Sequence, residues 1–250
     1  MPHVFVHGNP ETEAIWWPLA EELRARGIDD VVLLSPPGFG APVPAGWDAT
    51  YLSYRDWLVT ELERIGGDVH LVGHDWGAGH VYSVVAHRPD LLVSWAADCG
   101  GLLHPDYVWH SGAQEWQTPG LGEQVVSAML ERSPQQMLGF LAKRGISGDI
   151  AAHMAAGTNA DMGRCILGLY RSAAQPAMRD LGLMAEHAVR RPGLVIIATE
   201  DAFVGTASMA ENTAERLGAR TATLDGAGHW WMLEQPAAAA NSLCSFWAAL

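Results

Sequence analysis

The chain has 250 residues, of which 49% are hydrophobic and 17% are charged. This balance is typical of a globular protein and excludes a disordered chain. The formal net charge of −13 argues against nucleic acid and anionic membranes as partners.

The three cysteines, Cys99, Cys165 and Cys244, lie far apart in the sequence. They form neither a disulfide framework nor a zinc-type spacing, which fits a reducing cytoplasm. His70 and His74 are four residues apart, but on a strand that enters a turn, so they make a poor metal pair. We therefore expect no metal and no other cofactor. We also expect a cytoplasmic protein, because neither a secretory signal nor a membrane-spanning run is visible.

The predicted strands are short apolar runs, most of them closed by a turn signal. They span residues 3–6, 31–34, 69–72, 91–97, 194–198 and 220–224. Apolar residues at helical spacing lie between most of these strands, at about 15–27, 54–65, 78–86 and 237–249. This alternation predicts an α/β fold with a mostly parallel sheet that is covered by helices on both faces.

Residues 102–189 interrupt the alternation. They carry helical patterns and loop signals such as Thr118-Pro119-Gly120, but no convincing strand. We interpret them as a helical cap inserted over the strand ends. The core domain would then consist of residues 1–101 and 190–250.

The turn after the third predicted strand carries the main chemical signal. Gly73-His74-Asp75-Trp76-Gly77 leads into a helix of small residues and has the form glycine–x–nucleophile–x–glycine. Such a turn lifts one side chain above a parallel sheet, and its glycines allow the tight backbone. The lifted residue here is Asp75. A carboxylate suits displacement at a saturated carbon, which forms an ester of the enzyme itself, and epoxides and alkyl halides are the matching substrates.

Ligands in open α/β sheets bind beyond the carboxyl ends of the strands. Four of the predicted strands end in polar candidates, which are Gly8-Asn9, Asp75-Trp76, Glu200-Asp201 and Gly228-His229. The order acid, acid, histidine is that of an α/β-hydrolase triad with aspartate in place of serine. Over nearly its whole length, the chain resembles the α/β-hydrolase superfamily, and within it the aspartate-nucleophile branch of epoxide hydrolases and haloalkane dehalogenases.

The resemblance rests on four motifs, His7-Gly8-Asn9-Pro10, Gly73–Gly77, Ala198-Thr199-Glu200-Asp201 and Gly226-Ala227-Gly228-His229-Trp230-Trp231. It implies an α/β-hydrolase fold with Asp75 as the nucleophile, His229 as the base and Asp201 as the acid that orients it. Asp98, at the end of the fourth strand, is the alternative acid. The backbone N–H groups of Asn9 and Trp76 would form an oxyanion hole, in a substrate-binding segment that includes His7 and Gly8.

The leaving group separates the two reactions of this branch. Tyr170-Arg171 resembles the motif that supplies the proton donor of an epoxide hydrolase. The residue four before Trp116, where that family has a second tyrosine, is Gly112, and Tyr107 and His110 are candidate replacements. For the dehalogenases, Asn9 and the indole of Trp76 match the pair that holds the halide.

We therefore expect an epoxide hydrolase, with a haloalkane dehalogenase as the alternative. A relative that binds small ligands without turnover is a third interpretation. The expected partner is a small apolar epoxide or halide, and the protein would be a monomer or a homodimer.

Overall fold

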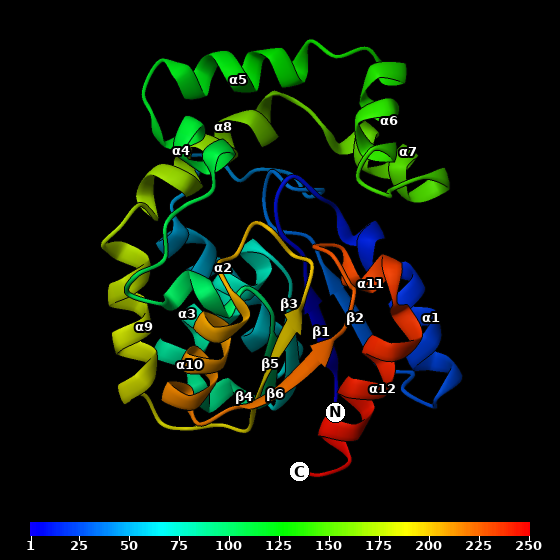
Figure 1. Cartoon of the computed structure of the whole chain (residues 1–250), viewed down its shortest axis with the longest axis vertical. Coiled ribbons are helices and arrows are strands. Elements are labelled where there is room, and N and C mark those ends of the chain that lie inside the picture. The colour runs from blue at the N-terminus through cyan, green and yellow to red at the C-terminus, as the bar shows by residue number, and fades with distance from the viewer.

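A computed structural model describes residues 1–250 and shows one six-stranded sheet (Figure 1). The strands are β1 (His3–Val6), β2 (Val31–Leu34), β3 (Val69–Gly73), β4 (Leu92–Ala97), β5 (Gly193–Ala198) and β6 (Arg220–Leu224). They lie in the order β2-β1-β3-β4-β5-β6, and every neighbouring pair is parallel. The predicted parallel sheet is confirmed, with each strand within a residue or two of its expected bounds.

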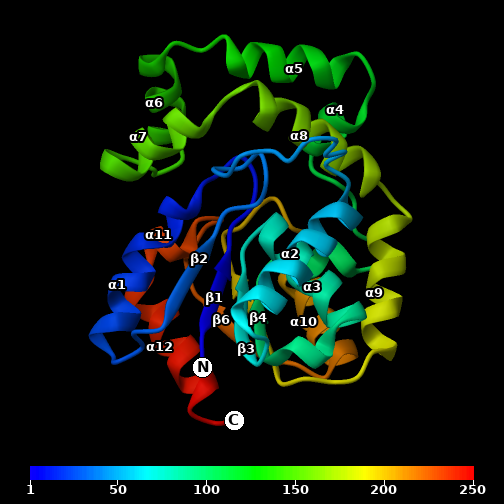
Figure 2. The same ribbon diagram turned by 180° about the vertical axis from the view of Figure 1, so that it is seen from behind.

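Helices cover both faces of this sheet (Figure 2). One face carries α1 (Trp17–Ala25), α11 (Trp231–Glu234) and α12 (Pro236–Trp247), and the other carries α2 (Tyr51–Ile65), α3 (Trp76–His87) and α10 (Ala207–Leu217). The central strand β3 is buried at every position, which explains why it reads as a continuous apolar run. The α/β fold predicted from the alternation is thus confirmed.

The first predicted helix is divided in two. A 3-10 turn, η1 (Glu13–Trp16), precedes α1, which begins only at Trp17. Pro18 is the second residue of α1. Proline has no N–H to donate and is tolerated only in the first turn of an α-helix, so the regular helix cannot start earlier.

Five helices lie above the carboxyl ends of the strands (Figure 1). They are α4 (Ser111–Gln117), α5 (Leu121–Leu130), α6 (Pro134–Ala142), α7 (Gly148–Gly157) and α8 (Ala160–Ser172). Two flanking elements also fall within residues 102–189 or at their border. These are η3 (Gly100–Leu103) and α9 (Ala177–His187), and both pack beside the core, with α9 against α3. The segment above the strand ends is therefore narrower than the expected cap.

Besides η1 and η3, the chain has a third 3-10 turn, η2 (Pro89–Leu91). None of the helices combines the length and the apolar character needed to cross a membrane.

Candidate active site

Asp75 occupies the turn between β3 and α3 with φ 51° and ψ −119°. A positive φ is uncommon for a residue with a side chain and costs on the order of 1–3 kcal/mol. The flanking glycines make the turn feasible, because a Cβ at Gly77 would collide with the carbonyl of Val6 and one at Gly73 with the backbone of Gly77. The strained turn presents the carboxylate above the strand ends.

The two oxygens of Asp75 have different surroundings. Oδ2 accepts a hydrogen bond from the backbone N–H of Asn9 at 2.8 Å. Oδ1 lies 4.0 Å from Nε2 of His229. Trp76 is the first residue of α3, where backbone N–H groups have no partner within the helix. One carboxylate oxygen is thus held by a loop donor, and the other faces the imidazole.

His229 is buried and is oriented by Asp201. Its Nδ1 lies 2.8 Å from Oδ2 of Asp201, and Oδ1 of Asp201 accepts the N–H of Phe203 at 2.9 Å. With the proton on Nδ1, Nε2 carries a lone pair toward Asp75. Burial acts to lower the pKa of His229, but the hydrogen bond to Asp201 and the negative charges of Asp201 and Asp75 outweigh it and raise that pKa above its ordinary value.

Asp98, the alternative acid, does not contact His229. Its Oδ1 accepts the backbone N–H of Asp75 at 3.0 Å. Its Oδ2 lies 2.5 Å from Nδ1 of His74 and accepts the indole N–H of Trp231 at 2.6 Å. The structure therefore places Asp201, and not Asp98, against the imidazole of His229.

A cavity of about 520 Å³ opens between the core and the cap and reaches Asp75 and His229. This volume is within the usual range of small-molecule sites. A second, smaller recess is lined by Trp76, Trp109 and Tyr170. Both spaces include Asp75 and Tyr170 in their walls.

Tyr170 lies on α8, 3% exposed, within a group of aromatic rings. Its ring centroid is 5.2 Å from that of Trp76 and 4.7 Å from that of Trp116. Burial and the charge of Asp75 raise the pKa of Tyr170 well above its ordinary value. The hydroxyl keeps its proton at neutral pH and can donate it.

The two candidate replacements for a second tyrosine differ in what they offer. The Tyr107 hydroxyl already donates to the carbonyl of Phe203 at 2.9 Å. Nδ1 of His110 accepts the N–H of Ala113 at 3.2 Å, and burial lowers the pKa of His110. A neutral ring with Nδ1 as acceptor must carry its proton on Nε2. His110 lines both spaces. Because the Tyr107 hydroxyl is already engaged, the Nε2–H of His110 is the free hydrogen-bond donor of the two residues.

A family model described as "Alpha/beta hydrolase family" matches residues 4–242. The chain belongs to the alpha/beta hydrolase family. This confirms the α/β-hydrolase fold expected from the sequence.

Solved structures of other alpha/beta hydrolases share this fold. A loop variant of the haloalkane dehalogenase DbeA from Bradyrhizobium elkanii is 20% identical, with a TM-score of 0.75 over 99% of this chain and 91% of that one. Cfl2 from Burkholderia cenocepacia is 21% identical, with a TM-score of 0.76 over 98% and 88%. E-2-(acetamidomethylene)succinate hydrolase is 19% identical, with a TM-score of 0.73 over 99% and 91%. No curated protein matches the chain.

Two residues of the expected substrate-binding segment have other neighbours in this alpha/beta hydrolase. His7 is fully buried, with Nδ1 3.0 Å from the carbonyl of Gly8 and Nε2 3.2 Å from the Ser35 hydroxyl. The N–H of Gly8 donates to Glu11. A Cβ on Gly8 would collide with the Asp75 carboxylate, so the absence of a side chain at Gly8 leaves space for that carboxylate. His7 instead contacts Gly8 and Ser35 within the protein.

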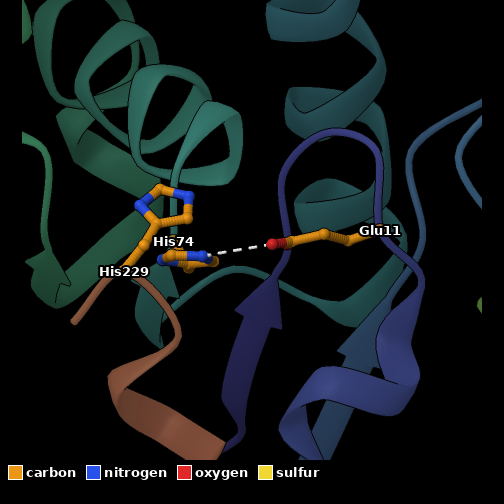
Figure 3. Close-up of side chains that lie close together, drawn as sticks. All are labelled: Glu11, His74 and His229. Atoms are coloured by element: carbon orange, nitrogen blue, oxygen red, sulfur yellow. Dashed lines mark ion pairs between the residues drawn. The ribbon is translucent and has the colours of Figure 1, made fainter. Parts of the chain in front are cut away.

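The sequence analysis missed a buried cluster of charged residues next to His229, and Figure 3 shows its Glu11–His74 ion pair. Glu11 Oε1 lies 3.3 Å from Nε2 of His74, and Asp98 lies at its Nδ1. Burial acts to lower the pKa of His74, but the two carboxylates raise it well above 6.5. In return, the charge of His74 overcomes burial and lowers the pKa of Glu11 to about 2 and also that of Asp98. The cluster is one imidazolium between two carboxylates.

The His74 ring lies against that of His229 in a tilted arrangement, with the two ring centroids 4.6 Å apart. Donor atoms of Glu11, His74 and His229 also lie within 4.8 Å of one another, a spacing that could hold a metal ion. However, Glu11 already accepts N–H groups from Trp230 and Gly8. Both ring nitrogens of His74 face carboxylates. These interactions favour a protonated ring over a metal ligand.

His74→Asn is expected to lower the free energy of unfolding by about 3–5 kcal/mol, because it leaves two buried carboxylates without their cation. Chemical denaturation at pH 7 measures this. His80→Asn is the control, since burial lowers the pKa of His80 to about 3 and its neutral ring stacks on Tyr54. Equal losses in the two variants would show that packing, not charge, explains the effect.

Proposed function

We propose that this protein opens epoxides to vicinal diols through a covalent ester on Asp75. The observation that carries the proposal is the position of Tyr170, which is buried and lines the cavity that also contains Asp75. Epoxide opening produces an alkoxide, which requires a proton donor close to the attacked carbon. A halide requires none.

The first step is displacement at carbon. Asn9 holds Oδ2 of Asp75, so Oδ1 is the oxygen that is free to attack. A new bond forms between Oδ1 and the epoxide carbon as the carbon–oxygen bond of the ring breaks, and the alkoxide takes the proton of Tyr170. The indole N–H of Trp76, the side chain of Asn9 and the Nε2–H of His110 are further donors for the departing oxygen.

The second step is hydrolysis of the ester. Nε2 of His229 takes a proton from water, and the hydroxide attacks the carboxyl carbon of Asp75. Negative charge moves to Oδ2, where the N–H groups of Asn9 and Trp76 stabilise it by an amount typically near 3–4 kcal/mol per donor. The ester bond to the product breaks, and the product oxygen takes the proton held by His229. The second proton of the water passes from the new carboxyl group back to Tyr170, so the diol leaves with the Asp75 carboxylate and the Tyr170 hydroxyl regenerated.

Haloalkane dehalogenation is the second candidate, with the same ester and the same hydrolysis. One observation favours it. The side chain of Asn9 is buried, and neither its amide nitrogen nor its oxygen has a partner within the protein. An unpaired N–H donor beside the nucleophile suits a halide leaving group, which accepts hydrogen bonds without taking a proton.

A panel of terminal and internal epoxides and of bromo- and chloroalkanes tests the proposal. Diol formation is followed by chromatography and halide release by ion electrode. We expect diol formation with at least some epoxides and a much lower rate of halide release. Halide release without diol formation would assign the dehalogenase reaction instead, and neither product would favour a binding protein.

The pH dependence separates the two half-reactions. Burial raises the pKa of Asp75 from 3.8 to about 6, and only the ionised carboxylate attacks. The rate of ester formation should therefore fall as the pH drops through about 6. Ester hydrolysis requires neutral His229, whose pKa is raised, so that rate should climb with pH through a value above 6.5.

Stopped-flow fluorescence of Trp76 and Trp230, which lie beside Asp75 and in the cavity wall, resolves the two phases. Ester formation that keeps its full rate down to pH 4 would contradict the raised pKa of Asp75.

A further inference from the structure

Two arginines from the loops that follow cap helices line the active-site cavity. Arg132 follows α5, and Arg144 follows α6. Both line the 520 Å³ cavity together with Phe140. Their guanidinium carbons lie 4.2 Å and 3.6 Å from the centroid of the Phe140 ring, so a single aromatic side chain brings two positive charges together.

Neither arginine has an acidic partner. In a chain of net charge −13, eight other arginines form ion pairs with Asp or Glu, namely Arg26, Arg55, Arg64, Arg88, Arg164, Arg171, Arg179 and Arg216. Arg144 donates only to the carbonyl of Phe140, and no hydrogen bond engages the Arg132 side chain. Burial and the charge of Arg132 lower the pKa of Arg144. Arg132 is half-buried and Arg144 is exposed, so the pair is a positively charged site that no carboxylate of the chain neutralises.

The acids nearby leave this charge unbalanced. Glu115 lines the same cavity but forms no ion pair with either arginine, and Glu131, next to Arg132, accepts the hydroxyl of Ser127. Although the chain has an excess of carboxylates, none of them forms an ion pair with Arg132 or Arg144. The missing counter-charge can come from a bound molecule.

The wall of the cavity that contains both this pair and the catalytic residues is more apolar than polar. Met129, Leu141 and Met154 contribute to it. In Figure 1, α6 and α7 form the end of the cap opposite α4 and α8, and Tyr170 belongs to α8. A molecule that reaches from Asp75 to the arginines must therefore cross an apolar stretch.

We propose that the substrate carries a carboxylate, which Arg132 and Arg144 bind, separated by an apolar chain from the carbon that Asp75 attacks. The part of this proposal that concerns the reactive carbon rests on the proposed function of the same site. The carboxylate-binding role of the two arginines is independent of that function. Guanidinium groups bind carboxylates through paired, charge-assisted hydrogen bonds. The substrate class is thus an amphipathic epoxy acid rather than the small apolar molecule that composition and motifs suggested.

Binding of unreactive ligands tests the carboxylate site without requiring turnover. The probes are linear carboxylates from hexanoate to dodecanoate and their primary amides, with the dissociation constant measured by calorimetry. Arg132→Gln and Arg144→Gln should each weaken carboxylate binding by about tenfold, and leave amide binding unchanged. Added salt should weaken the binding of carboxylates alone.

Lys143→Gln is the matched control, because it removes one positive charge from the residue next to Arg144, yet Lys143 does not line the cavity. Carboxylates and amides that bind equally well, or a Lys143→Gln variant as impaired as Arg144→Gln, would overturn the proposal. Terminal epoxides of the same acids then address the reaction. Loss of Arg132 or Arg144 should raise KM at constant kcat. Tight carboxylate binding without diol formation would refute only the proposed function.

Discussion

His229→Gln is expected to stop turnover after one covalent event and to leave the substrate bound to the protein. Nε2 of His229 lies 4.0 Å from Oδ1 of Asp75, and Nδ1 lies 2.8 Å from Asp201, so the ring is placed to activate water for ester hydrolysis. It takes no part in the attack of Asp75 on carbon. Loss of a general base lowers the rate of its step on the order of 10²–10⁴-fold. Ester formation should therefore outrun hydrolysis.

Intact-mass spectrometry after brief exposure to an epoxide measures the trapped ester. The expected mass increase equals the whole epoxide, because no atom leaves on ring opening, and peptide mapping should place it on Asp75. With a haloalkane, the increase equals the mass of the haloalkane less one molecule of hydrogen halide, because the alkyl group replaces the carboxyl hydrogen of Asp75 and the halogen leaves as halide. Asp75→Asn is the control and should acquire no adduct. An adduct on another residue would refute Asp75 as the nucleophile.

Tyr170→Phe is expected to lower the rate of epoxide opening by about 10²-fold or more, which is the usual contribution of a positioned acid. The rate of halide release from a haloalkane should change far less, because halide leaves without a proton. The substitution removes one buried oxygen and keeps the ring, which packs against Trp76 and Trp116. Single-turnover rates on both substrate classes measure the difference.

Tyr107→Phe is the matched control for this substitution. Tyr107 is also buried and lines the recess beside Asp75, but its hydroxyl is committed to the carbonyl of Phe203. Its loss should affect stability more than epoxide opening. Equal rate losses in the two tyrosine variants, or equal losses on epoxides and halides in Tyr170→Phe, would argue against Tyr170 as the proton donor.

These two experiments address different halves of the chemistry. The ester on Asp75 is common to the epoxide hydrolase and dehalogenase reactions, so trapping it supports either one over a binding protein. The tyrosine comparison then separates them, because only one leaving group needs a proton.

The positions of the strands along the chain and the turn at Asp75 could be predicted, because both depend on local signals. Buried parallel strands read as short apolar runs, and the glycines around Asp75 mark a backbone that few other residues can adopt. The bounds of the first helix and the placement of α9 were harder to predict from the sequence. An amphipathic period shows that a helix buries one face, but not which surface covers it, and α9 packs on α3 beside the core rather than above the strand ends.

The sequence by itself therefore determined the parallel sheet, the strained turn and the succession of Asp75, Asp201 and His229 along the chain. Only the tertiary structure decided which acid meets His229, that Glu11 and Asp98 enclose His74, and that Arg132 and Arg144 share the ring of Phe140 without a counter-ion. The physical reason is the distance along the sequence over which the interacting residues are spread. Backbone conformation follows from neighbouring residues, whereas the charge balance of a buried group depends on side chains that only the complete fold brings together.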